Sequence, residues 1–365
     1  MAKNKMTLDD ILEDITEYKL YHFSNGFFYN SQGELMSREK VRQELGYRYK
    51  RYKIDDIDKC EETLQEFNKA DSNDPRAIYL ASIKPLEGKC WLLGWLETEY
   101  PAYDWKQIFW DLIMHKSPRV YILYGIAEAG KSKILDILRL IFADYTKSFT
   151  IDQLSNRFNL GEVIGRLFIV GDDLGKENFG SVVGLIKSMA TGEPISLERK
   201  FMHSIECKNE GNFAFGCNQF PYLDINDDGV LRRFVVLIFD KKMKLPVQDY
   251  AEFVRDYINP TEAGKLFGQI QAVKHDPAYF NDKLHPQSKR YMLHESPVHK
   301  AGTEQYDMYS EYCRKHGFKP MNMENWQKVK KSIKDLETPE WVREIQEAEK
   351  RGEVTQLRID DDLPF

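Results

Sequence analysis

The amino-acid sequence predicts an α/β protein with a mostly parallel central sheet. Residues 119–124, 167–170, 212–217 and 234–239 are short, largely apolar runs, the pattern of strands that are buried on both faces. Segments with helical apolar spacing lie between these runs, and strands that alternate with helices favour a parallel sheet. The first run leads directly into a glycine-rich turn and a helix, so we place the centre of the fold at residues 119–140.

The composition describes a globular chain with no overall attraction to nucleic acid. At 365 residues and 42% hydrophobic content, the chain can fill two or three domains. Its formal net charge is −6, so any contact with nucleic acid must come from local basic patches or from a pore formed on assembly. Five cysteines without a CxxC pair argue against a disulfide framework and against a zinc site.

The sequence contains no recognisable targeting or membrane segment. Residues 1–14 lack the apolar core of a signal peptide, and the longest apolar run, residues 234–239, is too short to cross a bilayer. We therefore expect a cytoplasmic protein with no membrane partner.

Residues 1–80 form an N-terminal α+β module to which the sequence assigns no role. The pattern at residues 21–29 predicts a hairpin closed by Asn25-Gly26, and the pattern at residues 77–85 predicts a short strand. Residues 47–53 alternate cations with aromatic residues, as a surface that follows phosphates and stacks bases could do. A solvated strand or helix end is the simpler explanation of that segment.

Residues 125–132 match GxxxxGKS, the pattern of a phosphate-binding loop. The glycines let successive backbone N–H groups turn toward phosphate oxygens, and the helix that begins at Lys131 adds the partial positive charge of its N-terminus. Lys131 would reach the β- and γ-phosphates, and the Ser132 hydroxyl would coordinate Mg²⁺. The predicted site for ATP and Mg²⁺ comprises Gly125, Ile126, Ala127, Glu128, Ala129, Gly130, Lys131 and Ser132.

The apolar run at residues 167–170 leads into two acids, Asp172 and Asp173. A buried strand that ends in acids can place a Mg²⁺ ligand and a water-polarising base at the carboxyl edge of a sheet. An acidic turn after any core strand is the alternative, but here it follows a phosphate loop. We assign Asp172 to the metal and Asp173 to the orientation of the attacking water.

Two further polar features stand at strand ends. Asn218 follows the run 212–217 and could bond the γ-phosphate or the attacking water. Arg232 and Arg233 precede the run 234–239, and burying both would be costly, so at least one should face a partner anion such as nucleotide on a neighbouring subunit. An ordinary surface arginine pair is the alternative.

Five motifs in this order resemble the superfamily 3 helicases, the AAA+ motors of small DNA viruses, satellite phages and poxviruses. The resemblance is strongest to the helicase half of phage and plasmid primase-helicases and covers residues 105–245. The motifs are GIAEAGKS, LFIVGDD, TGEPISLERKF, FAFGCNQFP and DDGVLRRFVVLIF.

The resemblance implies an AAA+ type P-loop ATPase core that forms a ring, most simply a hexamer, with ATP at subunit interfaces. It implies that Arg233 is the arginine finger that acts on the nucleotide of a neighbouring subunit. It also implies that single-stranded DNA lies in the pore and that forked DNA is a substrate. Arg199 and Lys200 then fall on the hairpin that contacts DNA. The chain departs from the family in two respects. Asp173 is shorter than the glutamate that many relatives carry, and no primase region of recognisable length precedes the motor.

The C-terminal third predicts a helical connector and a second module. Helical spacing at residues 304–315 and 325–336, with a strand pattern at 353–358, resembles a winged helix. Its lysines, Lys328 and Lys331 among them, are candidates for DNA binding, and a solvated lysine face is an equally good explanation. The predicted domains are residues 1–80, the ATPase core 81–245, a helical lid or connector 246–300, the winged-helix-like module 301–358 and an acidic tail 359–365.

The chain end resembles the acidic tip of bacterial single-stranded-DNA-binding proteins. Its last residues are Asp362, Leu363, Pro364 and Phe365. A terminal carboxylate next to an aromatic ring forms a compact anchor for a basic-rimmed apolar pocket. We expect it to recruit host replication proteins or to lie on the protein's own basic surface; a plain acidic tail is the alternative.

The resemblance predicts an ATP-dependent replicative DNA helicase of a phage or mobile element, acting in the cytoplasm of a bacterial host. Two other functions stay open. One is an ATP-switched origin initiator or loader that does not unwind processively. The other is the accessory part of a primase-polymerase whose synthetic domain lies elsewhere.

Overall fold

The structure is a computed structural model that describes most of the middle of the chain. The chain divides into two compact units, Met1–Met292 and Leu293–Phe365. Asp173, Arg199, Lys200 and the tail 362–365 lie outside the described residues, as do the side chains of Lys328 and Lys331. The described residues are 21–24, 26–30, 32–37, 39–40, 74–156, 159–172, 179–197, 205–221, 223, 227–294, 306–315, 320 and 323–334.

The first unit contains a five-stranded sheet in which every neighbouring pair of strands is parallel. Its order is β10 (Phe234–Phe239), β4 (Val120–Gly125), β9 (Asn212–Cys217), β6 (Phe168–Gly171) and β5 (Thr146–Ser148). Val120 pairs with Phe234 on one side and with Phe213 on the other. The predicted α/β class and its mostly parallel sheet are confirmed, and the order places the carboxyl ends of β4, β9 and β6 next to one another.

Side chains on alternate positions of these strands enter two different cores. Tyr121, Leu123 and Val235 belong to one buried cluster, whereas Ile122 and Val236 are buried on the opposite face. Helices therefore cover both faces of the sheet, which explains why the strands are apolar throughout.

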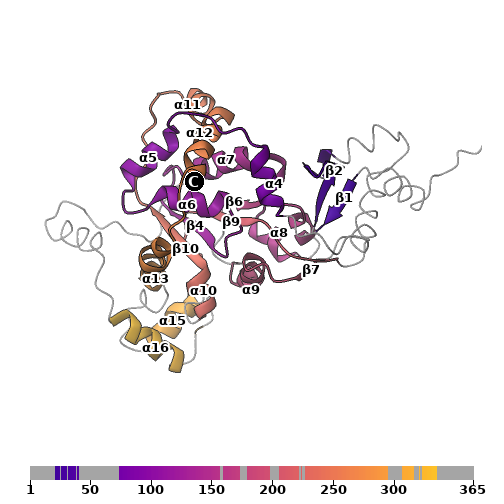
Figure 1. The fold of residues 1–365 in the computed structure, drawn as a ribbon. Helices are drawn as coiled ribbons and strands as arrows, with labels where there is room; N and C mark the ends of the chain where they lie inside the picture. The colour runs from indigo at the N-terminus through magenta and orange to yellow at the C-terminus, as the bar shows by residue number, and fades with distance from the viewer. Residues whose placement is uncertain are drawn as a thin grey trace, which may run out of the picture. The chain divides into compact units, whose positions relative to one another are not determined.

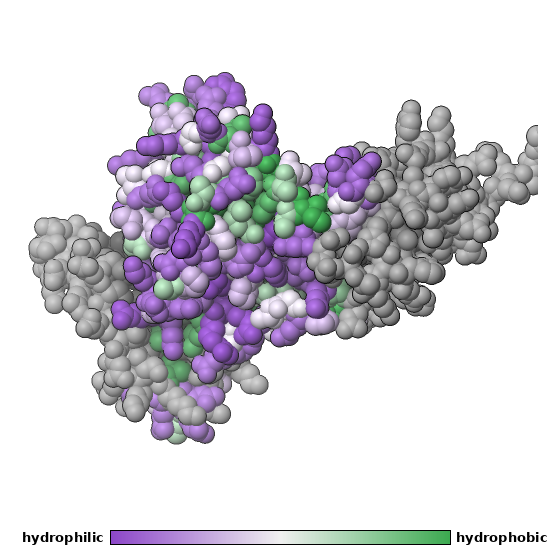
Figure 2. Space-filling model, viewed as in Figure 1, coloured by the Kyte–Doolittle hydropathy of each residue, from purple (hydrophilic) through white to green (hydrophobic). Residues whose placement is uncertain are grey.

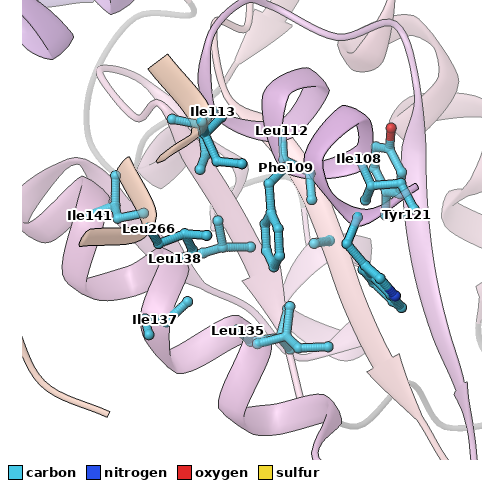
Figure 3. Close-up of a cluster of buried hydrophobic side chains, with 14 of the residues drawn as sticks. Ile108, Phe109, Leu112, Ile113, Tyr121, Leu135, Ile137, Leu138, Ile141 and Leu266 are labelled. Carbon is cyan, nitrogen blue, oxygen red and sulfur yellow. The ribbon is translucent and has the colours of Figure 1, made fainter. Parts of the chain in front are cut away.

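The larger cluster lies under α6 (Trp105–Ile113), α7 (Lys131–Phe142) and α12 (Pro260–Gln271), with α9 (Phe179–Ala190) on the other side of the sheet (Figure 1). In Figure 3, Phe109 of α6 extends toward Leu135 and Leu138 of α7. Packing of this kind holds α7, and hence the loop before it, in one position on the sheet.

The buried carboxylate of Asp111 anchors the segment that leads into β4. It accepts hydrogen bonds from Ser117 Oγ (2.5 Å), Tyr121 Oη (2.6 Å) and Arg119 Nη1 (2.7 Å), and it contacts His115 Nε2 at 2.9 Å. Burial raises the pKa of this carboxyl, but the hydrogen bonds and the Arg119 charge outweigh burial and hold the pKa below its ordinary value.

Residues 77–85 do not form the predicted strand; α4 (Pro75–Ser82) is a helix. Asp74 caps it, accepting from the N–H groups of Arg76 (2.9 Å) and Ala77 (3.2 Å), and Pro75 takes the first helical position. These start signals outweigh the β-prone composition. The buried Arg76 guanidinium then donates to the carbonyls of Ile113 (3.1 Å) and Glu210 (2.8 Å), which ties the helix to the core.

The predicted hairpin at residues 21–29 is confirmed. β1 (Tyr21–Ser24) and β2 (Phe27–Asn30) are antiparallel, and β3 (Leu35–Met36) extends the sheet. The hairpin lies on the core: Phe27 stacks on Tyr145 at 6.4 Å, and a Cβ at Gly165 would lie 2.5 Å from the Gly26 carbonyl oxygen.

Among the described residues, the other α-helices of the first unit are α5 (Trp91–Glu99), α8 (Ile151–Ser155), α10 (Asp228–Arg233), α11 (Tyr250–Tyr257) and α13 (His285–His294), the last of which continues into the second unit. A separate antiparallel pair joins β7 (Ile195–Leu197) and β8 (Ile205–Cys207). The second unit contains α15 (Tyr306–Lys315) and α16 (Met323–Lys334), joined by the edge-on contact of Tyr306 and Trp326 at 5.6 Å.

The face shown in Figure 2 is mainly hydrophilic over the described residues, with a smaller hydrophobic area near α4. None of the described helices has the length and apolar character that crossing a membrane requires.

Candidate functional site

The loop between β4 and α7 is shaped around two glycines. Gly125 has φ +152°, and a Cβ there would lie 1.9 Å from the carbonyl oxygen of Phe239. Gly130 has φ +82°, and a Cβ there would lie 2.9 Å from Met243 Sδ. Gly125 admits no side chain because its Cβ would collide with backbone, and the left-handed φ of Gly130 favours glycine there, so the loop is a backbone cradle held against the end of β10.

The N-terminus of α7 faces this cradle without a side-chain cap. Gly130 is the N-cap residue and offers no side chain to accept from the first N–H groups of the helix. These donors and the helix dipole attract an anion. A cradle that any Cβ would fill, next to uncapped helical N–H groups, fits a phosphate group, and the Ser132 hydroxyl is exposed at its rim.

Lys131 connects the cradle to the neighbouring strand. Only 7% of the residue is exposed, and its Nζ donates to the carbonyl oxygens of Gly125 (2.9 Å) and Ile126 (2.5 Å). It also donates to Oδ1 of Asn218 at 2.8 Å. The structure therefore brings together two residues that the sequence marks separately.

Asp172 stands at the end of β6, and its side chain is 49% exposed. Its Oδ2 accepts from Arg139 Nη2 at 2.5 Å, while Arg139 Nη1 donates to Asp136 at 2.8 Å. The carboxylate thus faces α7, the helix that also carries Ser132. A hydroxyl and a carboxylate are hard oxygen ligands of the kind that Mg²⁺ prefers, so the chemistry of these two side chains suits the predicted metal, while in this structure Arg139 pairs with the Asp172 carboxylate.

The other candidate catalytic residue in the described part is Arg233, the last residue of α10. Its Nη1 donates to the Gly229 carbonyl at 3.3 Å, and its buried Nε has no hydrogen-bond partner among the described residues. Arg232 is exposed, and its Nε donates to the Asp228 carbonyl at 3.2 Å. The two arginines therefore differ, and Arg233 is the one left with unmet hydrogen-bonding capacity.

An aromatic cluster beside the cradle was not anticipated from the sequence. Trp95 lies within 3.0 Å of a Cβ built at Gly130, and Trp91 stacks on it at 6.3 Å. Tyr250 of α11 lies 5.5 Å below the Lys133 ammonium and is 56% exposed. The i, i+4 spacing of the tryptophans is the signal that could have identified a shared helix face.

In the second unit, Lys330 Nζ lies 4.9 Å from the centre of the Trp326 ring. Trp326, Val329, Tyr309 and Cys313 are buried there, which agrees with the predicted apolar stripes of both helices.

The fold and this site define an α/β protein with a glycine cradle at the start of a helix, and known proteins resemble the chain over part or most of its length. Residues 123–233 match the model of a family of unknown function, DUF5906. The chain is 25% identical over 177 residues to a DNA primase-polymerase of Nitratiruptor phage NrS-1, a match that covers 47% of this chain and 24% of that protein. The matched segment is therefore about a quarter of the relative's length.

Solved structures of the C-terminal region of NrS-1 resemble this chain in fold. The apo structure has a TM-score of 0.53 at 16% identity, and an A form of the same region has 0.52 at 19%. Each match covers 88% of this chain and 85% of the other. At these identities the likeness concerns the fold alone.

Proposed function

We propose that this protein is an ATP-hydrolysing motor of phage DNA replication, a superfamily 3 helicase with an AAA+ type P-loop core. The observation that carries the proposal is the Gly125–Ser132 cradle with Lys131 bonded to Asn218. The similarity to a phage primase-polymerase supports a role in replication.

In this proposal the chain's own residues divide the work of hydrolysis. The loop N–H groups and Lys131 bind the β- and γ-phosphates, and Ser132 and Asp172 hold Mg²⁺, which when bound neutralises phosphate charge. Asp173 and Asn218 orient the attacking water. Arg233 of a neighbouring subunit stabilises the charge that develops on the γ-phosphate.

The proposed motor is a hexameric ring on single-stranded or forked DNA, with Arg199 and Lys200 on the DNA-contacting hairpin. A ring repeats each cation around its pore, so it can concentrate phosphate contacts although the chain carries a net charge of −6. Size measurement with a nonhydrolysable nucleotide tests the assembly: we expect a ring, and a monomer at all nucleotide concentrations would refute it.

ATP hydrolysis with and without single-stranded DNA tests the proposal, with Lys131→Ala as the comparison. We expect DNA-stimulated hydrolysis in the wild type and a loss of at least about 100-fold in the variant. Hydrolysis that Lys131→Ala leaves intact would refute the proposed site.

The second candidate is an accessory part of a primase-polymerase, and the similarity to the primase-polymerase of phage NrS-1 favours it. An origin initiator or loader is a third. Strand displacement on a forked duplex separates these from the helicase, since only the helicase should release a strand. Primer synthesis by this chain alone should be absent in every case.

Two peripheral elements complete the proposal. Lys328 and Lys331 of α16 contact DNA near the ring, and unchanged DNA affinity after replacing both with Glu would exclude that role. Asp362 to Phe365 recruit host replication proteins, and a pull-down in which deletion of residues 363–365 leaves every partner in place would exclude recruitment.

A further inference from the structure

Three charged side chains converge on Gly229, near the start of α10. A Cβ built on this buried glycine would lie 2.8 Å from Asp227 Oδ1, 3.0 Å from Lys187 Nζ and 3.1 Å from Arg233 Nη1. Lys187 comes from α9, whereas Asp227 and Arg233 stand at the two ends of α10. Two cations and one carboxylate therefore share a space that exists because residue 229 has no side chain.

The Asp227 carboxylate is fully engaged in this cluster. Its Oδ1 caps α10 by accepting from the N–H groups of Gly229 (2.7 Å) and Val230 (3.3 Å). Its Oδ2 forms an ion pair with Lys187 Nζ. Lys187 and these backbone donors hold the pKa of the Asp227 carboxyl below its ordinary value, so the carboxylate is ionised at neutral pH.

Arg233, in contrast, has no carboxylate partner in the part of the chain that the structure describes. It makes one long hydrogen bond, to the Gly229 carbonyl, and its Nε is buried without a partner there. The pKa of the exposed Glu193 carboxyl is lowered mainly by hydrogen bonds with Ser188 and Thr191. The charges of Arg233 and Lys187 contribute less to this shift. Asp227 shares the space around Gly229 with Arg233 and is a carboxylate that could hold it, but Lys187 already pairs with Asp227.

We propose that Lys187 is a positioning residue, which keeps Asp227 engaged and leaves the Arg233 guanidinium available to an anion outside its own helix. This inference rests on the proposed function, in which that anion is the triphosphate bound by a neighbouring subunit. Without Lys187, Asp227 becomes the counter-ion of Arg233 and holds the guanidinium against α10. A half-exposed ion pair reduces the available fraction by about fivefold.

Steady-state ATP hydrolysis with single-stranded DNA tests the inference through a pair of variants. Lys187→Met should lower kcat about fivefold with an unchanged KM for ATP, because the cradle residues are untouched. Adding Asp227→Asn should restore kcat, since asparagine caps the helix as well as aspartate but carries no charge to hold Arg233. A kcat of Lys187→Met equal to the wild type, or no restoration in the double variant, would overturn the inference.

A matched control comes from an ion pair elsewhere. Lys147 and Glu162 form a pair at 3.2 Å with side chains 34% and 53% exposed, so Lys147→Met should leave kcat unchanged. Thermal unfolding of all variants shows whether each is folded. A loss of kcat caused by damage to α10 would persist in the double variant and would therefore count against the inference.

A second measurement does not depend on hydrolysis. Phenylglyoxal modifies accessible guanidinium groups, and mass spectrometry of the full-length protein's peptides reports the reaction at Arg233. We expect Arg233 to react about fivefold more slowly in Lys187→Met than in the wild type, and to recover in the double variant. Arg255, which is 69% exposed, provides the internal reference rate.

The two measurements separate failure of the inference from failure of the proposed function. If the wild type hydrolyses no more ATP than Lys131→Ala, the proposed function fails, and the modification rates alone decide the role of Lys187. If the wild type hydrolyses ATP but neither kcat nor the Arg233 rate responds to Lys187→Met, the inference alone fails.

Discussion

Lys131 and Asn218 stand 87 positions apart in the chain and are joined by a hydrogen bond of 2.8 Å. The parallel pairing of β4 with β9 makes this possible, since it brings the ends of both strands to the same edge of the sheet. Bound triphosphate would compete with Asn218 for the lysine, which would leave the amide next to the γ-phosphate. The contact therefore joins the phosphate-binding loop to the end of β9, where Asn218 is expected to contact the γ-phosphate or the attacking water.

Replacing Asn218 should separate binding from chemistry. We expect Asn218→Ala to lower kcat for ATP about 100-fold, because the water loses an orienting partner, and to change KM by no more than about threefold. Steady-state kinetics measure both. Gln219→Ala, at the exposed neighbouring position, is the control, and an Asn218→Ala enzyme as fast as that control would exclude the role.

A methyl group at Gly125 should close the cradle. Because its Cβ would lie 1.9 Å from a carbonyl oxygen, Gly125→Ala should abolish nucleotide binding and destabilise the fold by about 2 kcal/mol or more. Gly184 of α9 has open space around its Cβ position, so Gly184→Ala should stabilise by about 0.5–1 kcal/mol. Calorimetric titration with ATP and thermal unfolding test both; normal binding by Gly125→Ala would contradict the shape of the loop.

Removing the charge of Asp111 should destabilise the protein. Asp111→Asn leaves the Arg119 guanidinium, whose side chain is only 13% exposed, without its counter-ion and cannot accept from every donor, which should cost about 3–5 kcal/mol. Urea unfolding measures the change. Asp256→Asn, which breaks a highly exposed pair with Arg255, should leave the urea midpoint unchanged, and similar effects from the two variants would refute an anchoring role.

His285 should make stability fall in mild acid. Burial, with a smaller contribution from Arg119, lowers the pKa of His285 to about 4, so between its ordinary pKa of 6.5 and 4 the unfolded chain binds more protons than the folded one. The contribution of neutral His285 to the free energy of unfolding should therefore be fully present above pH 6.5 and should decrease as the pH falls toward 4. Thermal unfolding across this range tests it, and His285→Gln should flatten the part of the slope due to this residue; an unchanged slope would contradict the assignment.

The sheet and the cradle could be predicted because local sequence determines them. Largely apolar runs mark β4, β9 and β10, and glycines 125 and 130 stand in the loop at positions whose backbone conformation or surroundings disfavour a side chain. β5 was missed because Thr146-Lys147-Ser148 is a short polar edge strand. Its position depends on pairing with β6, which local composition does not encode.

The long-range polar contacts could not be predicted, for a related reason. Arg76 donates to carbonyls that lie 37 and 134 positions away in the sequence. Lys187 forms an ion pair with Asp227, which lies 40 positions away. In the sequence, a charged residue that is buried with partners looks the same as one on the surface. Its burial and partners become visible only in the folded structure. The sequence identified Arg233 as a candidate, but the cluster around Gly229 needed the packing of α9 against α10.

Equilibrium binding of ATP in the presence of Mg²⁺, measured by calorimetry on the wild type and on Lys131→Ala, tests most directly whether the glycine cradle is a nucleotide site. We expect the wild type to bind ATP and Lys131→Ala to bind it at least about tenfold more weakly, with the Gly184→Ala control equal to the wild type. Absence of binding by the wild type, or equal affinity in Lys131→Ala, would contradict the motor proposed for this fold.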